Sequence, residues 1–405
     1  MTFRVRRPGL GVSAWASAVA AVLFGVSPAL ADTMDPAVER FVQQPTLTLN
    51  GKGNQALPSG LTCQGIAANP SGALATLQKA NGGKAFSPSI LNSLACQPAN
   101  AAFQNLVSEL GFAIAPTAFH PARTTGFGGF EFSIEASYTK INQDAYAPGT
   151  NIQYWHAGTQ GSVNPNTGLQ SQSNTSPDSV LQVYSLKMRK GLPFGFEIVG
   201  DVSYVANTTL FTAGADIRWA LLEGFRTGWP SYLPDVSVGG GVRSLTGTDE
   251  FSLTTVGIDV QISKPITVAD SSVITPYLGY QRLYIFGDSS TVNLAPNTDA
   301  LKSCGYAGTQ GNTPGTKGQP MTGEPACANN IPGTTTQNNF DFNNDTTFSQ
   351  VRTDRHRGIV GLNYRYEVLY LAGQFLFDLT PPNAENPGLV TTRQWTTSLE
   401  AGVYF

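Results

Sequence analysis

The segment that decides the fold is Phe130–Lys140, with the sequence FEFSIEASYTK. Apolar side chains occupy every even-numbered position from Phe130 to Tyr138, and polar side chains occupy the odd-numbered positions between them. Because successive side chains of a β-strand point to opposite faces, a period of two indicates a strand. The segment therefore predicts a strand that separates an apolar from a polar environment.

The same alternation recurs from Gly128 to the last residue. We predict strands near residues 129–140, 179–190, 196–206, 209–220, 235–244, 251–263, 273–286, 352–366, 368–379 and 393–405. Most have about ten residues or more, which matches the roughly 9 to 11 that a tilted strand needs to cross a bilayer. The usual strand of a soluble sheet has about 5 to 6 residues. We predict an all-β fold for residues 128–405, an antiparallel transmembrane β-barrel of about ten strands, within a range of about 10 to 14.

The connections between these strands differ in length. KGLPFGF and RYE are short, whereas residues 142–178 and 287–351 are long and rich in Asn, Thr, Gly, Ser and Pro. Outer-membrane barrels have short periplasmic turns and longer extracellular loops. A secreted β-sandwich also has alternating strands, but the strand lengths, the even strand number and aromatic residues near strand ends, such as Trp219 and Tyr366, favour the barrel.

Composition bears on the partners of the chain. Its 405 residues include 24 Lys and Arg against 27 Asp and Glu, a formal net charge of −3, and no basic stripe. We therefore expect no nucleic-acid partner. With 43 Gly and only 13% charged residues, the chain also departs from an ordinary helical domain.

The first residues predict export. Arg4, Arg6 and Arg7 precede an apolar stretch that closes on Ala29-Leu30-Ala31, which is the layout of a secretory signal peptide at residues 1–31. Residues 32–127 show short stretches with helical spacing and form a small N-terminal accessory or plug-like segment. Folded compactly, it would have a radius of gyration near ~12 Å, too large for the lumen of a ten-stranded barrel. We expect a periplasmic position with partial insertion into the lumen.

Four cysteines follow the signal peptide. Thiols outside the cytoplasm tend to be oxidised, and four cysteines allow three connectivities. Cys63 and Cys96 share the N-terminal segment, and Cys304 and Cys327 share one stretch rich in Gly, Thr, Pro and Asn. We predict disulfides between Cys63 and Cys96 and between Cys304 and Cys327. No C-x-x-C spacing occurs and the three histidines are scattered, so we expect no metal and no cofactor.

The polar faces of the predicted strands would line the lumen. About eight strands give an interior just filled by side chains, and about 16 to 18 leave an aqueous channel, so ten enclose little free space. The charges have both signs, which predicts ion pairs that brace the lumen, or a narrow polar path. The predicted lumen-facing residues are Glu131, Glu135, Arg189, Glu197, Asp201, Asp216, Arg218, Arg243, Asp259, Arg282, Arg357, Arg365 and Glu400.

The last predicted strand, RQWTTSLEAGVYF, ends on Phe405 and has apolar residues at alternate positions before it. Together with the export signal and the amphipathic strands, this ending resembles bacterial outer-membrane β-barrel proteins, in which the terminal strand is read by the barrel-assembly machinery. The resemblance implies a Gram-negative outer-membrane location. It also implies contact with lipid and lipopolysaccharide, the barrel-assembly machinery and periplasmic chaperones. The implied assembly signal is Leu399, Ala401, Val403 and Phe405.

A second stretch, QGIAANPSGALATL, is similar to the Asn-Pro-Ala-Gly-Leu stretch in the plug of outer-membrane transporters for long-chain fatty acids and aromatic hydrocarbons. The matching residues are Asn69, Pro70, Gly72 and Ala73. That family runs almost directly from the motif into its first strand, whereas here about 55 residues intervene. The same residues fit a helix start, in which Asn69-Pro70-Ser71 caps GALATLQKA.

A third stretch, VRTDRHRG, places Asp354 and His356 two positions apart, similar to the Asp-x-His half of the omptin proteases. Their second pair, Asp-x-Asp, has no counterpart here. Both residues have the lipid-side parity of Val360, where a charged rim would touch lipopolysaccharide. We expect no catalytic residue and no enzyme. The expected function is a narrow or plugged channel for small solutes, and the alternatives are a non-conducting structural or surface-binding barrel and an omptin-like surface hydrolase.

Overall fold

The architecture comes from a computed structural model. It describes residues 33–49, 52–68, 70–86, 88–162, 173–224, 232–269, 271–294, 304–307, 324–327, 345–380 and 393–405. The predicted signal peptide, residues 1–31, lies outside the described residues.

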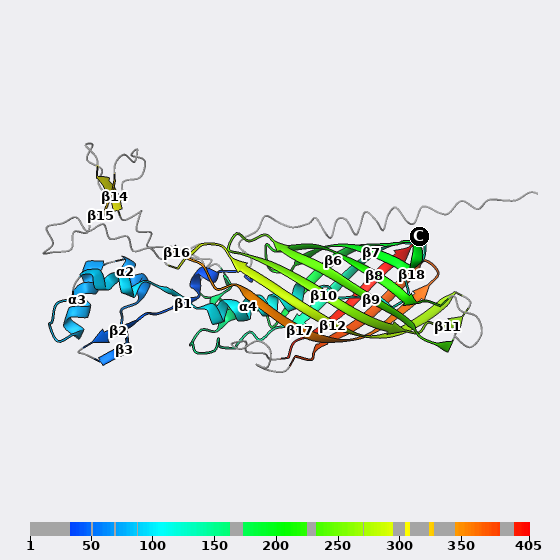
Figure 1. Cartoon of the computed structure of the whole chain (residues 1–405), viewed down its shortest axis with the longest axis horizontal. Helices are drawn as coiled ribbons and strands as arrows, with labels where there is room; N and C mark the ends of the chain where they lie inside the picture. The colour runs from blue at the N-terminus through cyan, green and yellow to red at the C-terminus, as the bar shows by residue number, and fades with distance from the viewer. Residues whose placement is uncertain are drawn as a thin grey trace, which may run out of the picture.

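Within the described residues, ten antiparallel strands close into a barrel, as predicted (Figure 1). Neighbours in the chain are neighbours in space, β5 pairs with β19, and β10 pairs with β12, which closes the ring. The short strand β11 (Ile266–Ala269) extends one edge of β12. The barrel strands are β5 (Phe130–Lys140), β6 (Val180–Gly191), β7 (Phe196–Val205), β8 (Phe211–Leu222), β9 (Asp235–Thr246), β10 (Phe251–Ser263), β12 (Ser272–Ser289), β17 (Val351–Tyr366), β18 (Leu369–Asp378) and β19 (Trp395–Tyr404).

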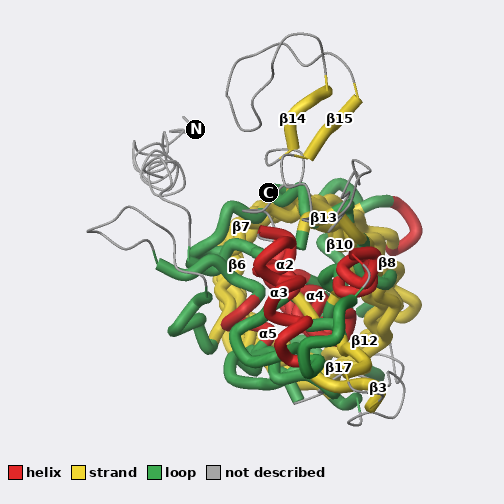
Figure 2. The backbone as a smooth tube through the Cα atoms, turned by 90° about the vertical axis from the view of Figure 1, so that its left-hand side faces the viewer, coloured by secondary structure: helices red, strands yellow, loops and turns green. Residues whose placement is uncertain are grey.

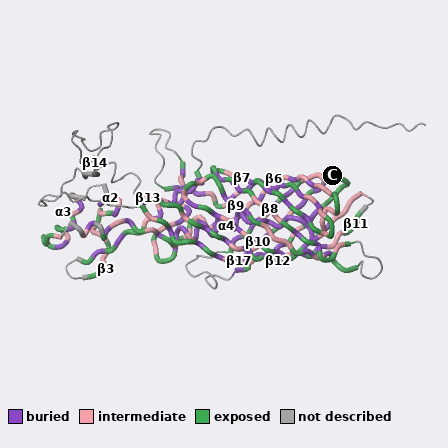
Figure 3. Tube along the Cα trace, turned by 45° about the horizontal axis from the view of Figure 1, so that its top comes forward, coloured by how far each residue is buried: buried purple, intermediate pink, exposed green. Residues whose placement is uncertain are grey.

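Burial alternates from residue to residue along the barrel strands (Figure 3), because successive side chains point to opposite faces. In β7, Ile198 and Val202 are exposed on the outer face, whereas Glu197 and Asp201 are buried inside. A soluble protein buries apolar side chains and exposes charges, so this arrangement is inverted. The outer face is suited to hydrocarbon, because the closed ladder satisfies the backbone hydrogen bonds of the strands.

The two ends of the barrel differ. Phe130 and Phe405 exchange main-chain hydrogen bonds at one end, where the connections 192–195, 223–234, 264–271 and 367–368 also lie. We call this the short-turn end. The opposite, long-loop end carries the long connections 141–179, 290–350 and 379–394 and the short connections 206–210 and 247–250. By the asymmetry of outer-membrane barrels, the short-turn end is periplasmic and the long-loop end extracellular.

Residues 33–99 lie beyond the long-loop end of the barrel (Figures 1 and 2). Their elements are η1 (Val38–Arg40), β1 (Val42–Gln43), β2 (Thr46–Leu49), β3 (Lys52–Ala56), α2 (Cys63–Ala68), α3 (Pro70–Ala80), η2 (Pro88–Leu94) and β4 (Gln97–Pro98). Ile66, Leu77, Leu91 and Leu94 form part of a small apolar core of their own. Cys63 and Cys96 form the predicted disulfide.

Helix α4 (Asn100–Ile114) enters the lumen from the long-loop end, and residues 115–122 continue through it. Almost all of α4 is buried, including the polar residues Asn105, Ser108 and Glu109. The helix ends just before Pro116, since a residue that precedes proline is pushed out of helical geometry, and Ala115 is extended. We call residues 100–122 the plug.

The predicted position of the N-terminal segment is confirmed in one part. Partial insertion into the lumen is present as α4 and residues 115–122. Residues 33–99 lie at the end opposite the short turns, so their periplasmic position stays a prediction, against which the asymmetry of the barrel loops argues. The transporter-like stretch does not enter the lumen either: Pro70 begins α3, as in the helix-start interpretation, and Asn69 lies outside the described residues.

The remaining elements belong to the long-loop end. They are α5 (Tyr154–Ala157) and the pairs β13 (Val292–Asn293) with β16 (Asp345–Thr346), and β14 (Cys304–Ala307) with β15 (Glu324–Cys327). The exception is η3 (Pro193–Gly195), which lies in the connection between β6 and β7 at the short-turn end. Cys304 stands opposite Cys327 in the β14–β15 register. The side chains of these two cysteines lie outside the described part of the chain, so this disulfide stays a prediction.

Candidate functional site: the plugged lumen

The lumen is lined by charged side chains on the inward-facing positions of the strands. Of the predicted residues, the structure buries Glu131, Glu135, Arg189, Glu197, Asp201, Arg218, Arg243, Asp259, Arg357 and Glu400, and half-buries Asp216. Burying a charge without a partner is costly, so the contacts of these groups decide what the lumen is.

One cluster of ion pairs joins β5, β6, β7 and β19. Lys187 forms an ion pair with Glu135, and its Nζ lies 3.8 Å from Glu400 Oε2. Arg189 pairs with Glu131 at 2.9 Å and with Glu197 at 3.4 Å. Each cation thus stands between two carboxylates from neighbouring strands, which braces the wall where β5 meets β19.

A second cluster joins β7, β8, β9 and β10. Arg243 contacts Asp201 at 3.1 Å and binds Asp216 through two hydrogen bonds of 2.5 and 3.0 Å. Arg218 Nη2 lies 3.6 Å from Asp259 Oδ1. Paired guanidinium and carboxylate groups leave few charges for a passing solute, so these residues act mainly on the protein itself.

The plug is held through its main chain. Long polar side chains from the wall donate hydrogen bonds to carbonyl groups between Pro116 and Pro121: Arg357 and Gln281 to Pro116 at 2.7 and 3.1 Å, Gln374 to Thr117 at 2.7 Å, Gln261 to Ala118 at 2.7 Å and Arg218 to Pro121 at 2.7 Å. These donors come from β8, β10, β12, β17 and β18, so they reach the segment from many sides of the barrel. The clamped segment has no regular secondary structure, and its Ala118 carbonyl also accepts a hydrogen bond from the His120 N–H at 3.0 Å.

Helix α4 fills the lumen at the long-loop end. Phe103 packs on Phe251 and Phe348, with ring centroids 5.9 and 4.7 Å apart. The guanidinium groups of Arg355 and Arg357 lie 4.5 and 5.0 Å from the ring centre of Phe112. These contacts combine apolar burial with cation–π attraction, and both resist withdrawal of the helix.

A buried carboxylate fastens α4 to the loop between β5 and β6. Glu109 accepts hydrogen bonds from the main-chain N–H of Asn142 at 2.9 Å, from the hydroxyl of Tyr154 at 2.7 Å and from the indole N–H of Trp155 at 2.7 Å. Three donors directed at one carboxylate stabilise its charge in a buried place. Glu109 thus pins the plug to a loop at the extracellular end.

Little space remains around the plug. Two cavities beside it, one bordered by Thr117 and Asp201 and one by Ala118 and Asp259, measure about 10 Å³ each. A cavity of this size has room for at most about one water molecule. A larger polar vestibule of about 580 Å³ opens at the short-turn end, bordered by Arg123, Glu223 and Arg365, among others. The clamped segment separates this vestibule from the long-loop end of the lumen.

Arg365 belongs to this vestibule. It has the inward parity of Asn363 but is exposed, because the lumen widens there into the vestibule. Its guanidinium lies 4.5 Å from the ring centre of Tyr404, and its Nε donates to the carbonyl of Glu367 at 2.9 Å.

The prediction for Arg282 is wrong, because it lies on the outer face of the barrel. Its neighbours Gln281 and Leu283 are buried inside, so the alternation of β12 turns Arg282 outward. There it pairs with Asp354 at 2.5 Å. His356 accepts or donates a hydrogen bond with the Tyr280 hydroxyl, so Asp354 and His356 have separate partners on the outer surface.

The C-terminal residues named as an assembly signal lie at the seam between β5 and β19. Leu399 and Phe405 are 59% and 78% exposed on the outer surface, and Ala401 is also exposed, whereas Val403 is half-buried. The main chain of Phe405 bonds to Phe130. Their role in assembly stays a prediction.

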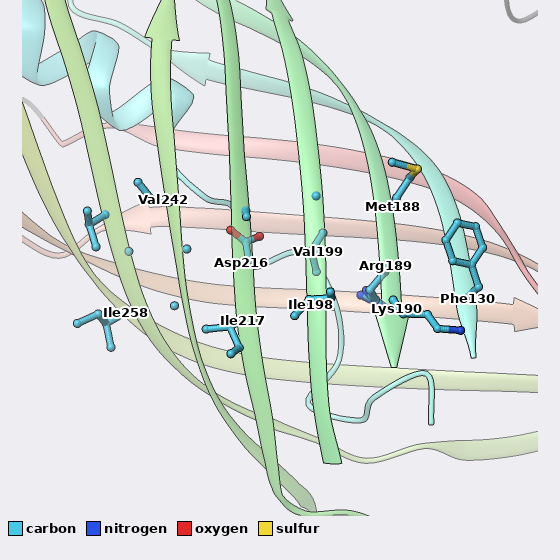
Figure 4. A pocket seen from close by; sticks show the side chains of 16 residues that line it. Phe130, Met188, Arg189, Lys190, Ile198, Val199, Asp216, Ile217, Val242 and Ile258 are labelled. Atoms are coloured by element: carbon cyan, nitrogen blue, oxygen red, sulfur yellow. The ribbon is translucent and has the colours of Figure 1, made fainter. Parts of the chain in front are cut away.

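The outer surface carries one broad apolar groove of about 680 Å³ over β6–β10 (Figure 4). Small residues at Gly200, Ala215 and Gly240 form its floor, because each has the outward parity of the larger residues around it. Ile198, Ile217, Met188, Val242 and Ile258 surround it. The groove faces the hydrocarbon of the membrane.

Sequence reasoning missed several residues that hold the plug and the wall. Lys187 has the inward parity of Arg189 and was identifiable by alternation alone. Gln261, Gln281 and Gln374 also stand on inward positions, but a neutral side chain gives no charge signal. Glu109 lies in a helix outside the barrel strands, so no strand pattern indicates its role.

Among the described residues, no helix is both long and apolar enough to cross a membrane. No group of three or more His, Cys, Asp and Glu side chains there is arranged to hold a metal ion.

No family model and no curated protein sequence matches the chain. Similar solved structures include Ail, the attachment invasion locus protein of Yersinia pestis, at 11% identity and a TM-score of 0.23, covering 69% of this chain and 99% of that chain. The outer membrane protein OprG from Pseudomonas aeruginosa has 9% identity and a TM-score of 0.23, covering 71% and 99%. The KdgM porin has 7% identity and a TM-score of 0.23, covering 68% and 98%.

These likenesses are weak, and the assignment rests on the barrel itself. Ten strands close without a free edge, apolar side chains cover the outside, and ion pairs fill the inside. This is the architecture of an outer-membrane β-barrel protein, and the chain is a protein of the Gram-negative outer membrane.

Proposed function

We propose that this protein is a sealed outer-membrane barrel that acts at its extracellular face as a surface-binding barrel, and that it conducts no solute while the plug is in place. The observation that carries the proposal is the clamp on the plug. Arg357, Gln374 and Gln261 bind consecutive carbonyl groups of residues 116–118. A segment held by several buried hydrogen bonds leaves the lumen only if all of them break together.

Single-channel recording tests this proposal. The purified full chain, inserted into planar lipid bilayers, is expected to give no conductance steps. The double variant Arg357→Ala, Gln374→Ala removes donors to Pro116 and Thr117, so its plug is expected to loosen and to give transient steps. Arg282→Ala, on the outer face, is the matched control and is expected to stay silent. Stable steps from the wild-type chain would contradict the sealed barrel.

A plugged channel for small solutes is the second candidate function. The vestibule of about 580 Å³ favours it, because it gives a polar solute a place to collect at the periplasmic end. Conduction would then require withdrawal of residues 115–122. If the double variant conducts no better than the wild type, loosening the clamp does not open a path, and this candidate loses its support.

We also propose that Asp354 and His356 do not form a hydrolytic pair. Asp354 pairs with Arg282, and the His356 ring bonds to Tyr280, so each side chain is engaged by a partner on the outer surface. His356→Ala is expected to leave peptidase activity of intact cells unchanged, with cells lacking the protein as the baseline.

A further inference from the structure

The route of the chain through the barrel determines on which side of the membrane residues 33–99 lie. Strand β5 begins at the short-turn end, beside Phe405. Residues 33–99 lie at the long-loop end, so the chain between them must cross the whole lumen. Since short turns are periplasmic in this class of barrel, residues 33–99 lie on the outer side of the membrane.

The N-terminal segment is also fastened at that end. The first described residues bond to two different loops: Met34 donates its N–H to the carbonyl of Asn207, Asp35 accepts from Thr209 at 2.5 Å, and Val38 donates to Glu250 at 2.9 Å. These partners lie in the connections β7–β8 and β9–β10. The chain that follows the predicted signal peptide therefore begins on the extracellular side.

The lumen recognises main chain more than side chains. The donors described above bind carbonyl groups from Pro116 to Pro121, which any residue type offers. Side chains add contacts: the Thr117 hydroxyl lies 3.2 Å from Lys187 and donates to Glu135 at 3.2 Å, Phe119 packs near Tyr370, and Ala118 packs with Tyr277. The segment is not fully extended, because Ala118 has a φ of 49° and its carbonyl accepts a hydrogen bond from the His120 N–H at 3.0 Å. The wall therefore holds an irregular stretch of polypeptide mainly, but not only, through its main chain.

The length of this segment also fits a membrane crossing. A chain of eight residues, 115–122, spans at most about 26 to 29 Å when extended. The outward-facing apolar band of such barrels is about 25 Å tall. Helix α4 lies on the long-loop side of this segment, and Arg123 lies on its short-turn side, at the vestibule. The plug thus connects the two ends of the lumen, and the turn at Ala118 keeps its span below the fully extended limit.

We propose that the lumen is a binding site for a non-helical stretch of polypeptide, and that through it the protein displays its own residues 33–99 at the cell surface. The barrel then serves as the membrane anchor, and the disulfide-linked N-terminal segment is the displayed part. The inference deepens the proposed function, because a sealed lumen and an outer working face are what display requires. It differs in its test, which reads accessibility and not conductance.

Epitope accessibility on cells tests the display. A tag is inserted between Gly82 and Gly83, an exposed turn after α3 in which both residues have positive φ. The matched control tag is inserted between Glu367 and Val368, the exposed turn between β17 and β18 at the short-turn end. Antibody is expected to label intact cells that carry the first tag, and to label the control only after the outer membrane is permeabilised. The opposite pattern, or labelling of the first tag only after permeabilisation, would overturn the proposal.

Two variants, one that keeps the length of the segment and one that shortens it, test the lumen as a polypeptide site. Replacing Thr117, Ala118 and Phe119 by Gly, Ser and Gly keeps every main-chain carbonyl, so labelling of the tag at Gly82 is expected to stay within about twofold of wild type. Deleting the same three residues removes up to about 10 Å of reach and is expected to abolish labelling. Heat-modifiable gel migration identifies the folded fraction, to which labelling is normalised.

The outcomes separate the two proposals. If the folded same-length variant loses surface labelling, recognition depends on side chains and the polypeptide site is wrong. If the deletion variant displays its tag as well as wild type, the segment does not set the crossing, and the proposal is also wrong. A chain that displays the tag but gives stable conductance steps would contradict only the sealed barrel.

Discussion

Buried charges of the lumen are stable only as sets. Lys187 stands between Glu135 and Glu400, and also donates to the Thr117 hydroxyl of the plug. Removing one partner of a buried ion pair leaves the other charge without compensation in a place that water does not reach. Residues of this kind therefore link wall stability to the plug.

Lys187→Met is expected to lower the free energy of unfolding by about 3 to 5 kcal/mol, because two carboxylates lose their cation. Guanidinium unfolding of the protein in lipid vesicles measures the loss. The double variant Lys187→Met, Glu135→Gln removes one of the stranded charges and should recover part of it. Equal stability of Lys187→Met and wild type would show that the pair contributes nothing net.

Glu250 gives the N-terminal attachment a pH dependence. It accepts a hydrogen bond from Val38, with Glu39 and Arg40 beside it. Burial, together with the charge of Glu39, raises the pKa of Glu250 from 4.5 to about 8. Between these values the folded state holds a proton that the unfolded state has lost, so the stability of this contact falls as pH rises through this window.

Hydrogen exchange of the segment Val38–Arg40 is expected to show more frequent opening at pH 8.5 than at pH 6, after correction for intrinsic exchange. Glu250→Gln keeps a carbonyl acceptor for Val38 but cannot ionise. Its opening should therefore be independent of pH. A wild-type segment whose corrected opening does not change with pH would contradict the role of Glu250.

At the scale of the element, α4 seats by close packing. A Cβ added to Gly111 would lie 2.5 Å from Cγ2 of Ile285 on β12, closer than carbon atoms approach in proteins. Glycine at this position therefore lets the helix approach the wall. On the outer face of the strands, Gly200 and Gly240 likewise leave space, and they form the floor of the groove.

Gly111→Ala is expected to weaken plug seating by about 1 to 3 kcal/mol through overpacking. Protease digestion of residues 100–122 in purified protein reports the opening of the plug. The compensating variant Gly111→Ala, Ile285→Ala makes room for the added methyl group and should restore protection in part. Unchanged protection in Gly111→Ala would mean that the wall gives way at little cost.

At the scale of the whole molecule, the barrel closes where its first and last strands meet. Phe405 and Phe130 exchange two main-chain hydrogen bonds of 2.8 and 3.2 Å, and their rings lie 6.2 Å apart. The seam joins residues that are separated by the full length of the barrel sequence. Closure therefore depends on contacts that form late in the chain.

Deletion of Phe405 is expected to lower the amount of protein assembled in the outer membrane several-fold, because the seam loses both hydrogen bonds and an outward aromatic side chain. Immunoblots of outer-membrane fractions measure it. Tyr366→Ala removes an exposed aromatic residue from the same end without touching the seam and serves as the control. Assembly that is equal in the deletion and in wild type would contradict a special role for Phe405.

The sequence by itself determined the barrel. Alternation, as in Phe130–Lys140, specifies which face of each strand is apolar, and strand length matches a bilayer, so all ten strands follow from local pattern. Alternation also identifies most of the charged lumen residues. It failed at Arg282, where the strand was assigned the opposite parity, and it left out the neutral Gln281 beside it.

Only the tertiary structure decided the path of the N-terminal segment. No local pattern states that α4 enters from the long-loop end or that Arg357 and Gln374 clamp Pro116 and Thr117, because these partners are about 240 and 257 residues apart in the chain. Hydrogen bonds to main-chain carbonyls leave no signature in residue type, since every residue has one. The side of the membrane on which residues 33–99 lie is therefore a property of the threaded barrel and not of their own sequence.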